Sequence, residues 1–266
     1  MLHKLATRLD KLGFRRSLAS LASVAYPGQQ FSVSPDGHWV NQQEACTIVS
    51  PSIHTASDRD MREWVMDTWT YCYTPKDGDV ILDIGAGVGE EAVVFSRLVG
   101  SGKIYAIEAH PDTYRCLSET LKRSGAHNVT PLHLALADTD GVARIDSGTA
   151  HVANSILSDT GVEVAQRSLD SLAAELNINA IDFLRMNIEG AEKFAIRGMT
   201  ETIKRVANVC ISCHDFAADI YRDDSFRTKA EVRIFLESNG FEVVTRPPDP
   251  AKPWVSDYLF GRVKRV

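Results

Sequence analysis

An alternation of apolar runs with helical segments from residue 79 onward most strongly limits the fold of this chain. The short apolar runs predict strands, and the segments between them have the spacing of amphipathic helices. Strands that alternate with helices form a mostly parallel sheet covered on both faces. The expected strands are 80–84, 103–108, 129–137, 181–188, 206–213, 241–245 and 254–263, with an extra strand at 142–145. The expected helices are 90–98, 111–124, 168–176, 191–205 and 228–238.

The last two expected strands, 241–245 and 254–263, follow one another without a helix between them. Strands joined this way pair as antiparallel neighbours, whereas parallel neighbours need a longer crossover. We therefore expect a Rossmann-like α/β fold with a mostly parallel seven-stranded sheet and an antiparallel edge strand.

The first 74 residues have a different pattern. Leu2, Leu5, Leu9 and Leu12 recur at helical spacing, and a polar, turn-rich stretch follows to about residue 50. Residues 58–71 predict a helix that is capped by Ser57 or Asp58 and places Met61, Trp64, Val65 and Trp69 on one face. We expect an N-terminal helical and irregular appendage at residues 1–74, followed by the main domain at 75–266.

Composition excludes several classes of protein. The 266 residues have a net charge of -6, which argues against a general affinity for nucleic acid. No run reaches the ~20 apolar residues of a transmembrane helix. Basic residues precede Ser17–Ala25 as in a signal peptide, but that run is short and broken by three serines. We expect a cytoplasmic protein whose first helix docks on the main domain, with a membrane surface or a homodimer contact as alternatives.

The five cysteines are scattered and odd in number, which suits a reducing compartment. Cys210-Ile-Ser-Cys213-His214 matches the pattern of c-type haem attachment. Its surroundings, Val206-Ala-Asn-Val-Cys-Ile-Ser-Cys213, are those of a buried strand, so we interpret the two cysteines as core residues.

A glycine-rich turn, Asp83-Ile-Gly85-Ala-Gly87-Val-Gly89, joins the first strand of the main domain to its first helix. Glycine has no β-carbon, so a ligand can approach the backbone closely at three positions of the turn. In a doubly wound sheet this turn lies at the carboxyl ends of the strands, where ligands bind.

The charges around this turn favour one kind of cofactor. The sixth position of a dinucleotide fingerprint is occupied here by Glu90, and a carboxylate at that helix start would repel a pyrophosphate. S-adenosylmethionine has no phosphate and carries a positive sulfonium and ammonium, which suit Asp83 and Glu90. Glu108 ends the next strand, where a carboxylate can accept both ribose hydroxyls. A nicotinamide oxidoreductase is the disfavoured alternative.

Several segments resemble the FkbM family of methyltransferases. They are Val80–Gly89, Ala106-Ile-Glu-Ala-His-Pro111, Ala135-Leu-Ala-Asp138 with the Gly141 turn, Ser168-Leu-Asp170, and Ile181-Asp-Phe-Leu-Arg-Met-Asn-Ile-Glu-Gly-Ala-Glu192 with Arg197-Gly198. The last block is the most particular to the family. The resemblance implies the class I methyltransferase form of the Rossmann-like fold and the methylation of hydroxyls on small molecules, often sugars or other secondary metabolites, with S-adenosylmethionine as donor.

The expected cofactor-binding residues follow from the glycine turn and from this resemblance. They are Asp83, Gly85, Ala86, Gly87, Gly89, Glu108, Ala109, Ala137 and Asn187. Two positions depart from the family pattern: Asn187 stands where Asp is usual, and Ser212 where Glu is usual. An amide cannot accept a proton as a base, but Asn187 can hydrogen-bond the cofactor or orient the acceptor.

An alcohol acceptor loses a proton when it is methylated, and a positioned base speeds that step. His214 is the first candidate because it follows the strand 206–213 and has an unperturbed pKa near neutrality. Glu189 is the second. Structural alternatives are a strand-end histidine and a carboxylate that stabilises the start of a helix. Glu189, His214 and Asp215 could also bind Mg²⁺, but their spacing is not diagnostic and we expect no metal.

The appendage is expected to cover the acceptor side of the cleft. Its aromatic residues Trp39, Trp64, Trp69 and Tyr71 are expected to pack it onto the main domain, with stacking on a sugar as the alternative. Asn154 and Ser155 are candidates for the mouth of the site, with a solvated turn as the alternative. The expected partner is a small hydroxylated acceptor. Two other functions remain open: N-methylation, and binding of the cofactor without catalysis.

Overall fold

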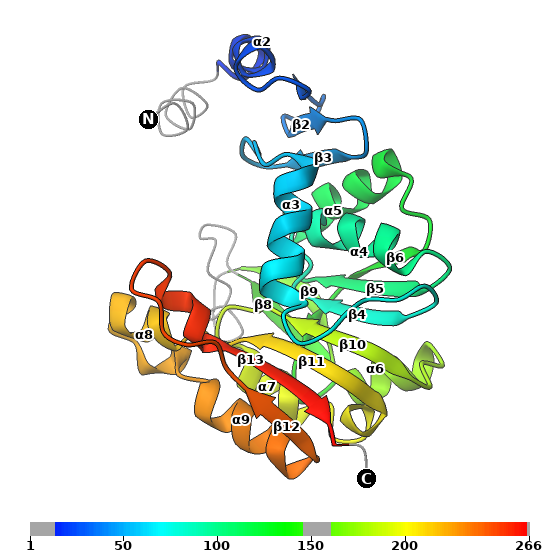
Figure 1. The fold of residues 1–266 in the computed structure, drawn as a ribbon. Coiled ribbons are helices and arrows are strands. Elements are labelled where there is room, and N and C mark those ends of the chain that lie inside the picture. The colour runs from blue at the N-terminus through cyan, green and yellow to red at the C-terminus, as the bar shows by residue number, and fades with distance from the viewer. Residues whose placement is uncertain (1–13, 146–160, 265–266) are drawn as a thin grey trace.

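A seven-stranded sheet is the centre of the computed structural model, which describes residues 14–145 and 161–264 (Figure 1). In sheet order its strands are β12 (Phe241–Val244), β13 (Tyr258–Val263), β11 (Val206–Ser212), β10 (Ile181–Met186), β4 (Val80–Ile84), β5 (Lys103–Glu108) and β6 (Val129–His133). The expected helix over Leu2 to Leu12 and the candidates Asn154 and Ser155 lie outside the described residues.

The pairing of the strands confirms the predicted Rossmann-like class I methyltransferase fold. Neighbouring strands from β11 to β6 are parallel, whereas β13 runs antiparallel to both β11 and β12. The antiparallel strand therefore lies one place in from the edge, and β12 forms the edge itself. The predicted antiparallel pairing at this edge is present, with β13 inserted between β11 and β12.

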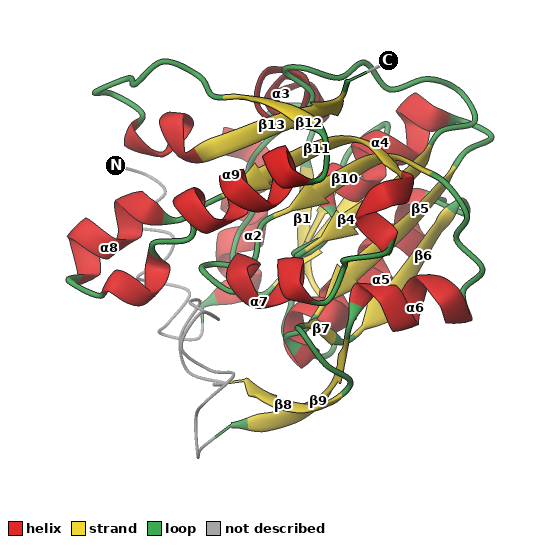
Figure 2. Cartoon of the chain, turned by 90° about the horizontal axis from the view of Figure 1, so that it is seen from below, coloured by secondary structure: helices red, strands yellow, loops and turns green. Residues whose placement is uncertain are grey.

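Two hydrophobic clusters cover the two faces of this sheet. On one face, Leu82 and Leu184 pack with α6 (Leu169–Glu175), α7 (Glu192–Arg197) and α9 (Lys229–Ser238) (Figure 2). On the other face, Ile81 and Phe183 pack with α3 (Asp58–Trp64), α4 (Glu90–Val99) and α5 (Pro111–Ser124). Successive strand residues point to opposite faces, so the continuous apolar runs of the sequence supply both clusters.

The helices on the second face end where local signals predict. In α5, Pro111 occupies the first turn, His110 accepts a hydrogen bond from the Thr113 N–H, and Gly125 adopts the left-handed conformation after the last residue. Ser57 and Asp60 form a capping box at the start of α3, which continues as the π-helical turn η1 (Val65–Trp69).

The N-terminal segment contains a small sheet that the sequence did not predict. After α2 (Arg15–Ala25), the strands β1 (Gln30–Val33), β2 (Trp39–Gln42) and β3 (Thr47–Ser50) form an antiparallel meander. Each strand has only four residues, too few for a clear pattern, and β3 is buried along its whole length, so its residues do not alternate as in a half-exposed strand. The expectation of an irregular segment here was therefore wrong.

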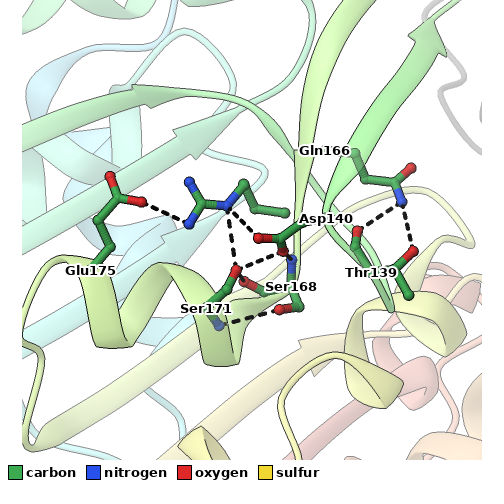
Figure 3. A network of polar contacts seen from close by, with 7 residues as sticks. Thr139, Asp140, Gln166, Ser168, Ser171 and Glu175 are labelled. Carbon is green, nitrogen blue, oxygen red and sulfur yellow. Dashed lines mark hydrogen bonds and ion pairs between the residues drawn. The ribbon is translucent and has the colours of Figure 1, made fainter.

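A second small sheet contains β7 (Ala135–Leu136), β8 (Gly141–Ile145) and β9 (Val162–Arg167). The expected strand 129–137 is therefore divided between two sheets, and β9 was not predicted. Arg167 bonds to Asp140 and Glu175, and Asp140 accepts from the Ser168 N–H and the Ser171 hydroxyl (Figure 3). These contacts fix the turn before β8 to the start of α6.

Two expected helical or extended segments are interrupted. The segment 191–205 contains α7 and the 3₁₀ turn η3 (Thr202–Arg205), because Gly198 lies against the Ala137 carbonyl, where a β-carbon would be only 2.0 Å from that oxygen. The segment before β13 forms the 3₁₀ turn η5 (Pro253–Asp257), and α8 (Asp215–Tyr221) and η4 (Asp224–Phe226) follow β11.

None of the helices in 14–145 and 161–264 has the length and apolar character that crossing a membrane requires.

Candidate active site

The carboxyl ends of four adjacent strands bring the predicted site residues together at the carboxyl-terminal end of the sheet. In the order β11, β10, β4 and β5, these strands lead into His214, the Asn187–Glu189 segment, the glycine turn and Glu108. Met186 pairs with Ile84 on one side and Ile211 on the other, which aligns the three ends. Residues more than 100 positions apart in the sequence therefore lie side by side, as expected for a doubly wound fold.

The glycine turn is closed towards the protein and open on one side. Gly85, Gly87 and Gly89 all have positive φ angles. A β-carbon on Gly85 would be 2.0 Å from the Asn187 carbonyl oxygen, and one on Gly89 would be 2.7 Å from Leu117 Cδ1. A β-carbon on Gly87 would meet nothing within 4 Å. The turn therefore needs glycine for close packing at its two ends and leaves the backbone at Gly87 accessible to a ligand.

Glu108 lies beside this open position and is almost completely buried. Its Oε2 accepts a hydrogen bond from the Gly87 N–H at 3.0 Å, and its Oε1 accepts one from the His110 N–H at 2.8 Å. Burial raises the pKa of Glu108 to about 7, although these N–H groups favour the ionised form. Each oxygen keeps a second lone pair. An open glycine backbone next to such a carboxylate fits the ribose of S-adenosylmethionine.

Asp83 lies beneath the glycine turn rather than in the cleft. Its side chain is fully buried, and its Oδ1 accepts a hydrogen bond from Arg185 Nη1 at 2.8 Å. The same nitrogen donates to the Gly85 carbonyl at 2.6 Å. Sequence reasoning assigned no role to Arg185, yet a charged residue inside an apolar strand needs buried partners, and that signal was present. Asp83 therefore supports the turn instead of facing a ligand directly.

A pocket of about 310 Å³ opens next to Glu90, the first residue after the turn. It is lined by His54, Ala56, Asp60, Met61, Trp64, Glu90 and Glu91. Glu90 Oε1 is 4.0 Å from His54 Nε2, and Glu90 Oε2 is a buried atom without a hydrogen-bond partner among the described residues. Burial and the neighbouring Glu91 raise the pKa of Glu90 to about 8. A cationic group in this pocket would favour the ionised form.

Glu189, His214 and Glu192 form a row at the ends of β10 and β11. His214 Nδ1 is 3.0 Å from Glu192 Oε1, and His214 Nε2 is 3.4 Å from Glu189 Oε2. Glu192 is fully buried and also accepts from the Gly190 N–H and the Thr228 hydroxyl. Glu189 has a left-handed backbone, with φ of 53°, which is uncommon for a residue other than glycine. Sequence reasoning missed the part played by Glu192.

The two carboxylates change the expected chemistry of His214. Burial would lower its pKa, but the hydrogen bonds to Glu189 and Glu192 and their negative charges raise it to about 10. The two carboxylates therefore favour the protonated imidazole at pH 7, which makes His214 a poor proton acceptor. The side chain of Glu189 is 34% exposed, whereas that of His214 is 4% exposed. Glu189 is thus the more accessible member of the pair.

Asp215 does not join this row. Its Oδ1 accepts from the N–H groups of Thr228 and Lys229. Across residues 14–145 and 161–264, no group of three or more His, Cys, Asp and Glu side chains converges on a position for a metal ion. Cys210 and Cys213 are fully buried, which confirms their interpretation as core residues.

The remaining predicted residues lie at different distances from the turn. Asn187 is adjacent to it, because its N–H donates to the Ile84 carbonyl at 2.9 Å and its own carbonyl faces Gly85. Ala86 is buried, and its N–H donates to the Ile107 carbonyl. Ala109 follows Glu108 directly, whereas Ala137 follows β7 and contacts Arg167 and Gly198. Cofactor contacts at Ala109 and Ala137 stay predictions.

The aromatic residues of the appendage have two environments. Trp39 and Trp69 are both 1% exposed, but Trp69 packs against the main domain with Ile81, whereas Trp39 packs within the appendage. Trp64 and Tyr71 are 39% and 51% exposed, and Trp64 lines the pocket next to Glu90. In the described chain, β3 packs on α5 and α3 packs on α4. The appendage therefore lies next to the glycine turn and the helix that follows it.

A separate groove of about 770 Å³ lies at the amino-terminal end of the sheet. Its lining includes Lys76, Lys204, Arg205, Arg262, Asp79 and Asp182, around the amino ends of β4, β10 and β11. None of the predicted site residues lines this groove. Its volume alone does not make it the active site, since ligands of open α/β sheets bind at the carboxyl ends of the strands.

Comparison with known proteins gives the family. The model of the methyltransferase FkbM domain matches residues 83–243, more than half of the 266 residues. The hexuronic acid methyltransferase AglP of Haloferax volcanii is 23% identical over 164 residues, covering 61% of this chain and 66% of the relative, just under two thirds of its length. Methyltransferase 1 of Beauveria bassiana is 23% identical over 214 residues, covering 69% of this chain and 80% of the relative.

A solved structure agrees with this result at the level of the fold. The FkbM methyltransferase of Methylobacillus flagellatus superposes with a TM-score of 0.50 at 15% identity, covering 75% of this chain and 50% of that one. The predicted enzyme class and the predicted methyl donor are confirmed by the family match. The chain belongs to the FkbM family of S-adenosylmethionine-dependent methyltransferases.

Proposed function

We propose that this enzyme methylates a hydroxyl group of a small acceptor, such as a sugar or another hydroxylated metabolite, and that Glu189 accepts the proton. The observation that carries the proposal is the row Glu189, His214 and Glu192 at the ends of β10 and β11. The row lies next to Asn187, which contacts the glycine turn. The resemblance to a hexuronic acid methyltransferase, at 23% identity, supports a sugar-like acceptor.

The residues that would hold the cofactor are those of the open turn. Gly87 leaves its backbone accessible, and Glu108 offers oxygen lone pairs to the ribose hydroxyls. Asn187 would bind from the next strand end with its amide group. When bound, S-adenosylmethionine supplies an electrophilic methyl group on a positively charged sulfur. The protein holds the acceptor oxygen in line with it, since alignment of the reacting groups lowers the barrier.

A hydroxyl that gains a methyl group must release its proton. A positioned carboxylate can take up that proton, and Glu189 pairs with the imidazole of His214, whose pKa is raised to about 10. Glu189 is the point of entry because its side chain is 34% exposed, while those of His214 and Glu192 are 4% and 0% exposed. His214 then orients Glu189, and Glu192 orients His214. We therefore assign proton acceptance to Glu189 in place of His214.

A methyl-transfer assay tests the proposal. Radiolabelled S-adenosylmethionine would be incubated with uronic acids, neutral sugars, phenols and matched amines, and NMR of the product would locate the methyl group. We expect methylation on oxygen, and Glu189→Gln is expected to lower kcat by about 10²-fold to 10⁴-fold, the contribution of a positioned base. The affinity of this variant for S-adenosylhomocysteine should not change.

Glu201→Gln is the matched control, because Glu201 is an exposed carboxylate that pairs with Lys204 away from the site. Its activity should equal that of the wild type. Methylation of the amines in preference to the hydroxyl compounds, or full activity of Glu189→Gln, would contradict the proposal.

A further inference from the structure

A buried cation holds the glycine turn from below. Arg185 is 2% exposed and lies inside β10. It donates to Asp83 and to the Gly85 carbonyl through Nη1, and its Nη2 is 3.6 Å from Glu91 Oε1. The guanidinium thus joins the end of β4, the first glycine of the turn and the first turn of α4. Moving a charge from water into the protein interior is unfavourable. Each of these partners therefore helps to hold the Arg185 guanidinium in its position.

The appendage supplies a further partner to the same cation. The indole ring of Trp69 faces the Arg185 guanidinium, with Cζ 4.0 Å from the ring centroid. Trp69 Nε1 also donates a hydrogen bond to Glu91 Oε1 at 3.3 Å. Trp69 is the last residue of the π-helical turn that extends α3, and only 1% of it is exposed. A desolvated cation over an indole face is a strong form of the cation–π interaction.

The geometry of the turn depends on this arrangement. The N–H groups of Gly85 and Ala86 donate to the Ile107 carbonyl, and the Gly85 carbonyl accepts from Arg185. The backbone of the first glycine is therefore held on both its N–H and its C=O side. Two residues later, the Gly87 N–H contacts Glu108. A shift of Arg185 would displace the Gly85 carbonyl and with it the position of Gly87 relative to Glu108.

We propose that Trp69 and Arg185 are positioning residues for cofactor binding, and that the helix from Asp58 to Trp69 is part of the cofactor site. Trp69 holds the guanidinium in the orientation that fixes the Gly85 carbonyl, and its N–H holds Glu91. The inference rests on the binding of S-adenosylmethionine and not on the identity of the acceptor or on the role of Glu189. It extends the expected function of the appendage from covering the acceptor to shaping the cofactor turn.

Trp39 provides a matched control within the appendage. It is also 1% exposed, but it packs in the cluster of α2 and β1 with Leu18 and Phe31. The test compares Trp69→Leu with Trp39→Leu by calorimetric titration with S-adenosylhomocysteine and by urea unfolding. We expect both variants to lose stability. Only Trp69→Leu should bind the ligand more weakly, by about tenfold or more.

Conservative variants keep the test valid if the Leu variants do not fold. Trp69→Phe retains a ring over Arg185 and loses the hydrogen bond to Glu91, so its dissociation constant should rise about threefold to fivefold. Trp39→Phe should bind as the wild type does. Arg185→Lys keeps the charge but not the planar fork, and it should bind more weakly than the wild type and more tightly than Arg185→Gln.

Tryptophan fluorescence gives a readout that general loss of stability would not alter. The change in emission at saturating S-adenosylhomocysteine should be smaller in Trp69→Phe than in Trp39→Phe but should not vanish, because both variants keep Trp64, which lines the pocket next to Glu90. Equal dissociation constants in the wild type and the Trp69 variants would overturn the inference, as would equal weakening by the Trp39 and Trp69 variants. A wild-type protein that takes up no ligand would instead contradict the cofactor assignment itself.

Discussion

The acidic residues at the carboxyl ends of the strands have different roles, which follow from their surroundings. Asp83 is paired with Arg185 under the glycine turn, and Glu192 is enclosed by hydrogen-bond donors. Glu108 is also buried, but among the described residues its two oxygens bond only to backbone N–H groups. Burial therefore dominates at Glu108 and raises its pKa to about 7. Its ionisation is thus sensitive to pH in the physiological range.

This property predicts a pH dependence of cofactor binding. Ribose hydroxyls donate to the ionised carboxylate, whereas below about pH 7 the free protein binds a proton there. Binding then has to expel that proton, so affinity should fall as the pH decreases from 8 to 5.5, by at most about tenfold per pH unit. Calorimetric titration with S-adenosylhomocysteine across this range measures the effect.

Glu108→Gln separates this effect from the titration of other groups. The variant should bind more weakly at pH 8, and its affinity should vary much less with pH. A wild-type affinity that is constant from pH 5.5 to 8, or a variant with the same slope as the wild type, would contradict the assignment of Glu108.

The roles of single residues were predictable from the sequence where a local sequence pattern marked them. The glycine turn and Glu108 follow directly from a strand, a turn and a second strand end. The protonation state of His214 was not predictable, because Glu189 and Glu192 approach it only after β10 and β11 pair. Arg185 could have been identified by asking which groups neutralise a charge inside an apolar strand.

At the scale of the elements, α5 supports both the sheet and the appendage. The Val49 N–H donates to Thr120 Oγ1 at 2.9 Å, and the Thr47 N–H donates to Ser124 Oγ at 3.0 Å. The same hydroxyls donate back to the carbonyls of Val49 and Thr47. Thr120 and Ser124 are four residues apart and share one face of the helix. They satisfy backbone groups that the outer strand β3 would otherwise leave unpaired.

Thr120→Val tests this docking, because it keeps the shape of the side chain and removes its hydroxyl. Thr120 is fully buried, so the Val49 N–H would lose its partner without gaining water. The free energy of unfolding in urea should fall by about 1–3 kcal/mol. Ser118→Ala, on the same helix but only half-buried, should change it by less than about 0.5 kcal/mol. A Thr120→Val protein as stable as the wild type would show that these bonds contribute nothing.

Long and periodic elements were predictable, and short ones were not. The helix Pro111–Ser124 and the strand Lys103–Glu108 have the expected bounds, since caps and a continuous apolar run mark their ends. The strands β1 to β3 were missed because four residues are too few to show a period, and β9 was missed because only one of its six residues is buried. The break at Gly198 reflects the approach of the Ala137 carbonyl, which no local pattern reveals.

At the scale of the whole molecule, the two edges of the sheet differ in charge. Acidic side chains gather around the glycine turn and the strand ends next to it, while Lys76, Lys204, Arg205 and Arg262 surround the groove at the amino ends. A cofactor with a positive sulfonium and ammonium suits the acidic edge. The alternation of strands and helices predicts that the site lies at the carboxyl ends of the strands, because parallel strands all end on the same side of the sheet.

The most direct test is a crystal structure with bound S-adenosylhomocysteine, which is what the methyl donor becomes after transfer. The account predicts the ribose hydroxyls about 3 Å from the Glu108 carboxylate, with the ligand over Gly87 and its sulfur on the side of Asn187 and Glu189. Ligand bound in the basic groove at the amino ends of the strands, or a ribose away from Glu108, would contradict it.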